Sequence, residues 1–443
     1  MNSKAPYTEA FVWVWLPGAV DPVVAGKLTA DGEYLIFNYG KSYLARKNAI
    51  PLYDPELPLQ SGHISLLPSL RMPACIRDAS PDAWGRRVII NRKLGGKGAK
   101  VDTARFDELT YLLESGSDRI GALDFQRSAT EYVPRGTEKA SLAKLARAAE
   151  YIEKGMPLTP ELDQALQHGT SIGGARPKAQ INDGDKKYIA KFSSTTDLYS
   201  LVKAEFVAMR LAALCGLNVA KVSLTRSLHK DVLLIERFDR VHLEAGWQRK
   251  LMVSALTMLA LDEMMARYAS YEDLSELIRH RFADASDTLR ELYARLVFNI
   301  LCGNTDDHAR NHAAFWDGQT LRLTPAYDIC PQGRTGYEAS QAMLIVGDDR
   351  MSRISSCLNA AGHFLLSRAE AIAIVAHQLT CIIDNWDAVC AEADLIATDR
   401  AFLWGRQFLN PYAFQDLDGD AAQLKTMADT ARRGSSKFRE QYL

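Results

Sequence analysis

The stretch GNTDDHARNHAAFWDGQTLRLTPAYDICP, residues 303–331, decides how this chain is expected to fold. It gathers three aspartates and two histidines within a dozen positions and then reaches one further aspartate, Asp328. The alternating runs AAFW and TLRLTP flank Asp317-Gly318, a dipeptide typical of a tight β-hairpin turn. Because a hairpin returns the chain to its starting point, we expect Asp328 to lie near Asp306 and Asn311.

Length and composition indicate a globular chain with more than one unit. Its 443 residues exceed the roughly 250 to 300 at which single hydrophobic cores stop growing. With 47% hydrophobic and 24% charged residues, the chain has an ordinary globular composition. The net charge of −1 gives no overall field for nucleic acid, so such binding would need a local patch. The basic run GRRVIINRKLGGKGAK at 85–100 is one candidate, although such a run is more often a solvated loop.

Cysteine usage and hydropathy indicate the compartment. The seven cysteines are scattered and never spaced CxxC, which argues against a disulfide framework or a structural zinc site. A reducing cytoplasm is the expected location. The longest uncharged run, 371–383, is shorter than the roughly 18 residues that a spanning helix needs, so no membrane segment is expected.

The pattern changes from β-type to helical along the chain. Residues 11–60 contain VWVWL, EYLIFNY and SYLARK between turn residues, which predicts a small antiparallel sheet. SPDAWGRRVIINRKL predicts a helix that stops at the glycine-rich GGKGAK, and further helices are expected at 104–115 and 139–154. Strand KYIAKF, helix LVKAEFVAMRLAALCGL and strands KVSLTRS and DVLLIERF follow, and beyond about residue 250 the pattern is mainly helical. The sequence therefore predicts an α+β chain, β-rich first and helical later.

The opening stretch matches the chemistry of a kinase catalytic loop. Asp306 and Asn311 are five apart, as are the kinase aspartate that accepts the substrate hydroxyl proton and the asparagine that holds magnesium. Asp328 would then supply a carboxylate to the same ion. A helix cap and a turn residue are the plainer interpretation. A zinc site at His308 and His312 lacks the HExxH glutamate, and an EF-hand lacks its glycine and its final glutamate.

Candidates for nucleotide binding lie upstream in the order that a bilobal kinase needs. TSIGGARPKAQI (170–181) could bring backbone N–H groups close to phosphates, and Lys191 in KYIAKF could reach them from a strand. Glu205 could pair with Lys191 or could simply favour the helix start. LLIERFDR (233–240) ends a strand where a kinase hinge would offer backbone groups to adenine and the Asp239 carboxylate to ribose.

TSIGGARPKA, LLIERFDR, NTDDHARN and PAYDIC together resemble the HipA family of toxin-type serine/threonine kinases. LPLQSGHISLLPSL and RDASPDAWGRRVI resemble the extra N-terminal subdomain of that family, so the resemblance covers roughly residues 11–430. It implies a bilobal protein-kinase-like fold. The implied parts are an N-terminal subdomain at 1–125, a kinase N-lobe with phosphate loop and hinge at 126–245, and a helical C-lobe at 246–443.

The resemblance also assigns roles to residues. It implies that Asp306 is the catalytic base, that Asn311 and Asp328 bind Mg²⁺, and that Ser171 is autophosphorylated. Asp307 stands where some relatives carry glycine and adds a negative charge beside the base. The residues implied to bind ATP are Gly173, Gly174, Ala175, Arg176, Pro177, Lys178, Lys191, Glu236, Arg237, Phe238, Asp239, His308 and Tyr327.

The partners of the family complete the expectation. The resemblance implies a protein substrate in the translation machinery, such as an aminoacyl-tRNA synthetase, and a separately encoded HipB-like helix-turn-helix antitoxin. DNA would be met only through that antitoxin. Two alternatives stay open: a small-molecule phosphotransferase with a similar loop, and a nucleotide-binding regulatory protein that acts through a DNA-binding partner. The presence of Asp306, Asn311, Asp328 and Lys191 argues against the second alternative, because a protein without catalysis would be free to lose them.

Overall fold

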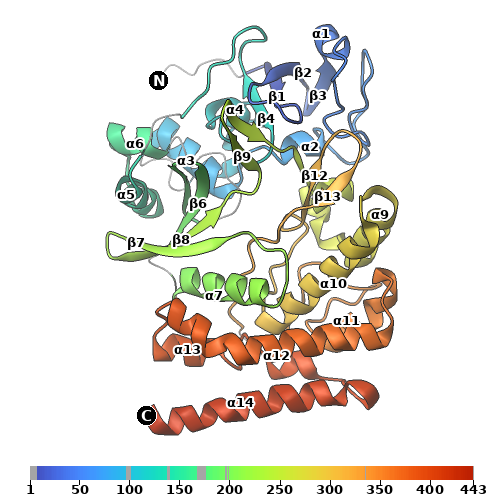
Figure 1. The fold of residues 1–443 in the computed structure, drawn as a ribbon. Coiled ribbons are helices and arrows are strands. Elements are labelled where there is room, and N and C mark those ends of the chain that lie inside the picture. Colours follow the sequence, from blue (N-terminus) through green and yellow to red (C-terminus); the bar gives the residue numbers. More distant parts are fainter. Residues whose placement is uncertain are drawn as a thin grey trace. The chain divides into compact units, whose positions relative to one another are not determined.

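The chain folds into two compact units (Figure 1). The computed structural model describes residues 7–95, 101–136, 140–166, 176–194, 197, 199–334 and 336–442. Unit 1 comprises Met1–Thr196, Thr225–Asp262 and Ala314–Thr320, and unit 2 comprises Asp197–Leu224, Glu263–Ala313 and Leu321–Leu443. The predicted order, β-rich first and helical later, is confirmed. The expected boundaries near residues 125 and 245 stay a prediction.

In the part of the chain described here, no helix combines the length and the apolar character that crossing a bilayer requires.

Unit 1 begins with the predicted antiparallel sheet. Strands β1 (Glu9–Val14), β2 (Val23–Asp31) and β3 (Tyr34–Tyr39) pair in sequence, and β4 (Leu123–Gln126) adds to β1, giving the order β3-β2-β1-β4. The prediction was wrong for SYLARK, where Lys41–Leu44 forms the short helix α1. Helical geometry stacks the Tyr43 ring on Tyr39 at 5.6 Å and lets its hydroxyl donate to the Ile50 carbonyl at 2.8 Å. An extended SYLARK would forfeit this burial.

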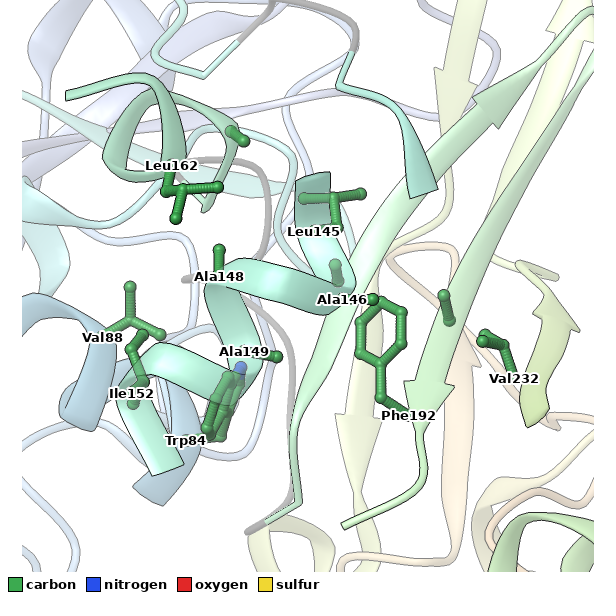
Figure 2. Packing of buried hydrophobic residues seen from close by; sticks show 13 residues of the cluster. Trp84, Val88, Leu145, Ala146, Ala148, Ala149, Ile152, Leu162, Phe192 and Val232 are labelled. Atoms are coloured by element: carbon green, nitrogen blue, oxygen red, sulfur yellow. The ribbon is translucent and has the colours of Figure 1, made fainter. Parts of the chain in front are cut away.

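A second sheet carries the predicted strands around KYIAKF. Its order is β5-β6-β8-β7, from β5 (Lys178–Asp183), β6 (Lys186–Phe192), β8 (Lys230–Glu236) and β7 (Val222–Ser227). Helices α3 (Ala83–Leu94), α5 (Leu142–Glu153) and α6 (Pro160–Leu166) share an apolar core with this sheet, shown in Figure 2. Trp84 contributes its indole ring to that core and donates from Nε1 to the Lys178 carbonyl at 3.0 Å.

The predicted helix boundaries in unit 1 are mostly confirmed. Helix α3 follows Asp82 and stops at Gly95, whose φ of 59° belongs to the left-handed region. Of the apolar positions predicted at helical spacing in α5, Leu145, Ala149 and Ile152 are buried and Leu142 is half-buried. The helix expected at 104–115 is instead split into a 3₁₀ turn, η2 (Thr103–Arg105), and α4 (Glu108–Glu114). Asp107 interrupts it, because its side chain accepts from the Thr110 N–H at 2.7 Å and caps α4.

Unit 2 is built around the buried helix α10 (Ala285–Cys302). The long helix α12 (Arg368–Glu392) packs against α10, against α7 (Leu201–Leu214) and against α14 (Ala422–Tyr442). Figure 1 shows α7, α12 and α14 as successive layers of this unit. Further helices are α9 (Tyr271–Arg281), α11 (Ile354–Ala360) and α13 (Ala397–Leu403). The C-terminal end of α10 is the element that leads into the candidate site.

The remaining elements are short. They are α2 (Ala74–Arg77), β9 (Arg240–Leu243), β10 (Gly246–Arg249), β11 (Met252–Ser254), α8 (Ala255–Met258), η4 (Glu263–Tyr268), β12 (Ala313–Trp316), β13 (Leu321–Leu323), η5 (Ala361–Phe364), η6 (Pro411–Phe414) and η7 (Gly419–Ala421).

Candidate active site

The candidate catalytic loop begins where α10 ends. Gly303 closes the helix with φ of 75°, a left-handed conformation that favours glycine. A Cβ added there would lie 2.6 Å from the Gln407 carbonyl oxygen, so the backbone of a distant segment also excludes other residues. Beyond the glycine, the Asn304 N–H donates to the Asn299 carbonyl at 2.8 Å, and their side-chain amides bond at 2.9 Å. The sequence therefore stops the helix at one defined place.

Hydrogen bonds to the backbone carbonyl of Asp306 close the loop. That oxygen accepts from the His308 N–H at 2.9 Å and from Nδ2 of Asn311 at 3.2 Å. The Asp306 N–H donates to the side chain of Asn304 at 3.3 Å. Because Asn311 uses its amide nitrogen for this bond, its Oδ1 is the atom suited to ligating a cation. The five-residue spacing thus corresponds to one closed turn.

The predicted hairpin follows the loop and is confirmed. β12 and β13 are neighbouring strands, and the Thr324 N–H donates to the Ala313 carbonyl at 3.0 Å. Asp317 makes the turn as expected, since its side chain accepts from the N–H groups of Gln319 and Thr320 at 2.9 and 2.8 Å.

Two hydrogen bonds fix the returning segment to the loop. The Tyr327 hydroxyl donates to the Arg310 carbonyl at 2.7 Å, and the Gln332 N–H donates to the Gly303 carbonyl at 3.0 Å. Asp328 lies between them, with φ of 59°.

Asp306 and Asp328 interact electrostatically, as the hairpin argument predicted. Partial burial and the nearby Asp328 and Asp307 carboxylates raise the pKa of Asp306 above its ordinary value, against an opposing effect of His308. Two carboxylates that repel one another at a loop are a suitable setting for a divalent cation, which would relieve the repulsion. The donor set, two carboxylates and an amide oxygen, is of the hard oxygen type that Mg²⁺ prefers.

Asp307 points away from this chemistry. Its side chain is buried, lies 3.0 Å from His312 Nε2 and accepts a hydrogen bond from the Tyr271 hydroxyl. Burial alone would raise the pKa of this carboxyl, but His312 and Tyr271 lower it below its ordinary value. The extra carboxylate expected beside the base is therefore turned into unit 2, where His312 and Tyr271 hold it. Tyr271 was not foreseen, because no sequence motif connects α9 to a loop 36 positions away.

His308 offers a further unused atom. Its Nδ1 is buried and has no hydrogen-bond partner, which leaves a ring nitrogen able to bind a ligand atom beside Asp306.

Lys178 and Lys191 lie directly opposite one another on β5 and β6 of unit 1 and are both buried. Pro177 is buried as well, and its carbonyl accepts from the Phe192 N–H at 3.1 Å. Arg176 is half-buried. Ser171, Gly173, Gly174 and Ala175 lie outside the described residues. The pairing of Lys191 with Glu205 of unit 2 stays a prediction.

The hinge residues alternate between two environments. Glu236 and Phe238 are half-buried: Glu236 pairs with Lys186 at 3.1 Å, and the Phe238 ring lies 6.0 Å from that of Phe315. Arg237 and Asp239 are buried and bonded to each other at 2.8 Å. The Asp239 carboxylate, expected to face ribose, thus accepts from Arg237 and Arg240 and from the Gly121 N–H.

Comparisons with known proteins cover most of the chain. The family described as HipA N-terminal domain matches residues 14–126, and the family described as HipA-like C-terminal domain matches residues 170–386. The Y4mE protein of Sinorhizobium fredii is 26% identical over 355 residues, 71% of this chain and 76% of the relative. A "Serine/threonine-protein kinase toxin HipA" of Shewanella oneidensis is 27% identical over 187 residues, 36% of this chain and 42% of the relative.

A solved structure has the same fold over nearly the whole chain. It is the HipA chain in a complex of HipA, HipB and operator DNA from Shewanella oneidensis, with a TM-score of 0.68 at 20% identity, covering 96% of this chain and 97% of that one. At this identity the likeness establishes the fold, which is a bilobal, kinase-like α+β fold. Since the N-terminal and C-terminal domains of one family match in order along the sequence, the chain belongs to the HipA family.

Proposed function

We propose that this chain is an ATP- and Mg²⁺-dependent serine/threonine protein kinase. The observation that carries the proposal is the grouping of Asp306, Asn311 and Asp328 in unit 2, where one loop and the returning hairpin are joined by hydrogen bonds. In kinases an aspartate, an asparagine and a later aspartate hold these roles in this order. The name of the Shewanella oneidensis relative, a serine/threonine-protein kinase toxin, supports the same activity.

The position of each side chain supports the role proposed for it. Asp306 is exposed at the loop surface, and its raised pKa suits a group that accepts the proton of a substrate hydroxyl. Asn311 and Asp328 would hold Mg²⁺, which supplies charge neutralisation for the transferred phosphoryl group. His308 would contact the nucleotide through its unpartnered nitrogen. In unit 1, Lys178, Lys191 and the backbone of the hinge would hold the phosphates and the adenine.

The activity is tested by phosphoryl transfer from radiolabelled ATP to a generic protein substrate and to the chain itself. Asp306→Asn should reduce the rate by roughly a hundredfold to ten-thousandfold, since general-base help is lost, while nucleotide binding is retained. Asn311→Ala and Asp328→Asn should raise the Mg²⁺ concentration needed for half-maximal rate. Asp287→Asn, an exposed aspartate on α10, serves as the matched control and should behave as wild type. Full activity of Asp306→Asn would contradict the proposal.

We further propose that the kinase is a growth-inhibiting toxin restrained by a separately encoded HipB-like helix-turn-helix protein. The family membership and the HipA–HipB–DNA title of the similar structure support this. The chain would meet DNA only through that partner, and its target would be a translation component such as an aminoacyl-tRNA synthetase. Expression of the wild-type chain in the host cytoplasm without its partner should slow growth. Expression of Asp306→Asn should not. Harmless expression, together with ATP turnover that depends on a metabolite, would favour a small-molecule phosphotransferase instead.

Autophosphorylation at Ser171 is part of the proposal. A phosphate there would add about −1.5 to −2 charge next to the glycine pair expected to cover the ATP phosphates. We expect the modified loop to lose ATP and the kinase to inhibit itself. Intact mass spectrometry should find one added phosphate on wild-type protein and none on Ser171→Ala or Asp306→Ala. Unchanged ATP affinity in Ser171→Asp would contradict self-inhibition.

A further inference from the structure

A buried ionic cluster in unit 1 fixes the hinge strand to a loop that the sequence motifs leave unassigned. We call it the hinge anchor, and it consists of Asp118, Lys187, Arg237, Asp239 and Arg240. Asp118 belongs to the segment between α4 and β4, over a hundred positions before the hinge. Its carboxylate lies 3.0 Å from Arg237, 2.9 Å from Arg240 and 2.6 Å from Lys187. One carboxylate therefore joins the end of β8, the start of β9 and a residue of β6.

The backbone around Asp118 completes the anchor. The Arg119 carbonyl accepts from Nη2 of Arg237 at 2.6 Å, and the Gly121 carbonyl accepts from Nη1 of Arg240 at 2.8 Å. The Gly121 N–H donates to Asp239 at 2.8 Å. Gly121 has φ of 77°, which favours glycine, so this close approach depends on the local sequence. Both the charges and the backbone of the loop hold the hinge.

Side chains of the hinge strand alternate between two faces, and one of these faces contacts the hinge anchor. Successive side chains of an extended segment point to opposite faces. Arg237 and Asp239 face the anchor and are almost completely inaccessible, with side-chain exposures of 1% and 3%. Glu236 and Phe238 alternate with them and are only half-buried. Holding one face rigidly thus sets where the backbone and side chains of the other face lie.

We propose that Asp118 is a positioning residue that, through the hinge anchor, sets the hinge for adenine and thereby the preference for ATP over GTP. This rests on the proposed function, because the ligand of the hinge is the nucleotide of that kinase. Asp118 touches no substrate and acts only through Arg237, Arg240 and Lys187. Adenine and guanine present opposite donor and acceptor edges, so a hinge held in one register discriminates between them.

The anchor contains three cations and two carboxylates, and losing one carboxylate should release the hinge. Without the Asp118 charge, Arg237 and Arg240 are left with Asp239 as their shared carboxylate, and Lys187 loses its 2.6 Å salt bridge. The arginines should then shift, and the strand between them should lose its fixed register. We expect the ratio of GTP to ATP dissociation constants to fall roughly tenfold in Asp118→Asn, equivalent to about 1.4 kcal/mol. A simple loss of stability would weaken binding of both nucleotides equally and leave the ratio unchanged.

Asp124→Asn provides the matched control. Asp124 is a fully buried aspartate of the same unit and is held by Arg119 at 2.9 Å, Arg135 at 3.0 Å and the Tyr132 hydroxyl at 3.1 Å. Its amide variant should lower the melting temperature as Asp118→Asn does, because each removes a buried charge from paired arginines. Its GTP to ATP ratio should equal that of wild type.

The experiment is isothermal titration of the full chain with ATP and with GTP, accompanied by circular dichroism melts. An unchanged ratio in folded Asp118→Asn, or an equal change in Asp124→Asn, overturns the inference. If Asp118→Asn does not fold, Lys187→Gln provides the test, because it removes the 2.6 Å salt bridge to Asp118 by changing a partly exposed side chain. The ratio of GTP to ATP dissociation constants should also fall in Lys187→Gln, and an unchanged ratio overturns the inference. A wild-type chain that binds neither nucleotide overturns the proposed function, and the inference with it.

Discussion

Asp306 and Asp307 are neighbours in sequence, yet replacing each by asparagine should have opposite effects on the stability of the fold. Asp306 is partly exposed, and partial burial and the Asp328 carboxylate both disfavour its charged form, whereas Asp307 is buried between His312 and Tyr271. Asparagine is nearly isosteric with aspartate and removes only the charge. The pair of variants therefore separates a charge placed for chemistry from a charge placed for structure.

For Asp307→Asn the structure predicts a large loss. The change removes the buried carboxylate that lies 3.0 Å from His312 Nε2 and accepts a hydrogen bond from the Tyr271 hydroxyl. Each hydrogen bond to a charged group contributes about 1.5 to 3 kcal/mol, so the loss of both costs about 3 to 6 kcal/mol. For a unit of about two hundred residues, each 1 kcal/mol lowers the melting temperature by roughly 2 to 4 °C. We therefore expect a decrease of at least about 6 °C, with kinase activity lost at temperatures that unfold the loop.

For Asp306→Asn the sign is reversed. A carboxyl whose folded pKa is raised is destabilising when ionised, so its contribution becomes less favourable as pH rises through that pKa. The amide removes this penalty at neutral pH. Because the side chain is exposed, solvent screens the repulsion and the gain should lie between zero and about 1 kcal/mol. Kinase activity should nevertheless be lost, which is the usual relation between an active-site charge and stability.

The assay is thermal and urea unfolding of both variants at pH 7.5 without nucleotide, beside wild type and the Asp287→Asn control. Phosphoryl transfer is measured on the same preparations at a temperature below every melting transition. An Asp307→Asn protein that melts with wild type would refute the assignment of a structural charge. An Asp306→Asn protein that is as destabilised as Asp307→Asn would refute the claim that Asp306 is under electrostatic strain.

Three further outcomes follow from particular contacts. Gly303→Ala should lower the melting temperature more than Gly347→Ala, because both glycines have positive φ but only the first would bring its Cβ to 2.6 Å from a carbonyl oxygen; equal shifts would contradict this. Phe192→Ala should destabilise unit 1 by about 3 to 5 kcal/mol in urea unfolding, since the ring is buried in the core of Figure 2. Burial opposes ionisation of Asp118 and Asp239, but the surrounding arginines lower both pKa values, that of Asp239 to about 2. The stability contributed by these two carboxylates, whose pKa values are lowered, is present above about pH 4 and is lost as pH falls toward 2. Over that range the melting temperature of the wild type should therefore decrease more steeply than that of Asp118→Asn.

Sequence patterns predicted those parts of the fold in which a local rule and the tertiary structure agree. The Asp317-Gly318 turn, the apolar stripe of α5 and the glycine stop of α3 all depend on residues within a few positions of one another. SYLARK failed because its β-type composition was outweighed by the burial of Tyr43 against Tyr39 in helical geometry. Strand β4 was missed because its pairing partner β1 lies more than a hundred positions earlier.

In the candidate site too, the local features could be predicted from the sequence and the contacts with distant residues could not. The spacing of Asp306 and Asn311 and the return of Asp328 could be anticipated, because a loop and a hairpin are local structures. The direction of the Asp307 side chain could not, since it depends on Tyr271 in α9. Likewise, LLIERFDR indicates a hinge but does not reveal that Arg237 and Asp239 face inward to Asp118, a residue with no motif of its own.

These distant partners explain how a loop can hold charges that repel. Asp306 and Asp328 would separate if the backbone beneath them could move. Hydrogen bonds to the Asp306, Arg310 and Gly303 carbonyls restrain that backbone locally. The side chain of the next residue, Asp307, is fixed in the interior by His312 and Tyr271. Because the two residues share a peptide bond, this also restrains the backbone of Asp306. The favourable interactions of one aspartate thus offset the unfavourable interactions of its neighbour. The buried charge of Asp307 is therefore the structural condition for the exposed charge of Asp306 beside it.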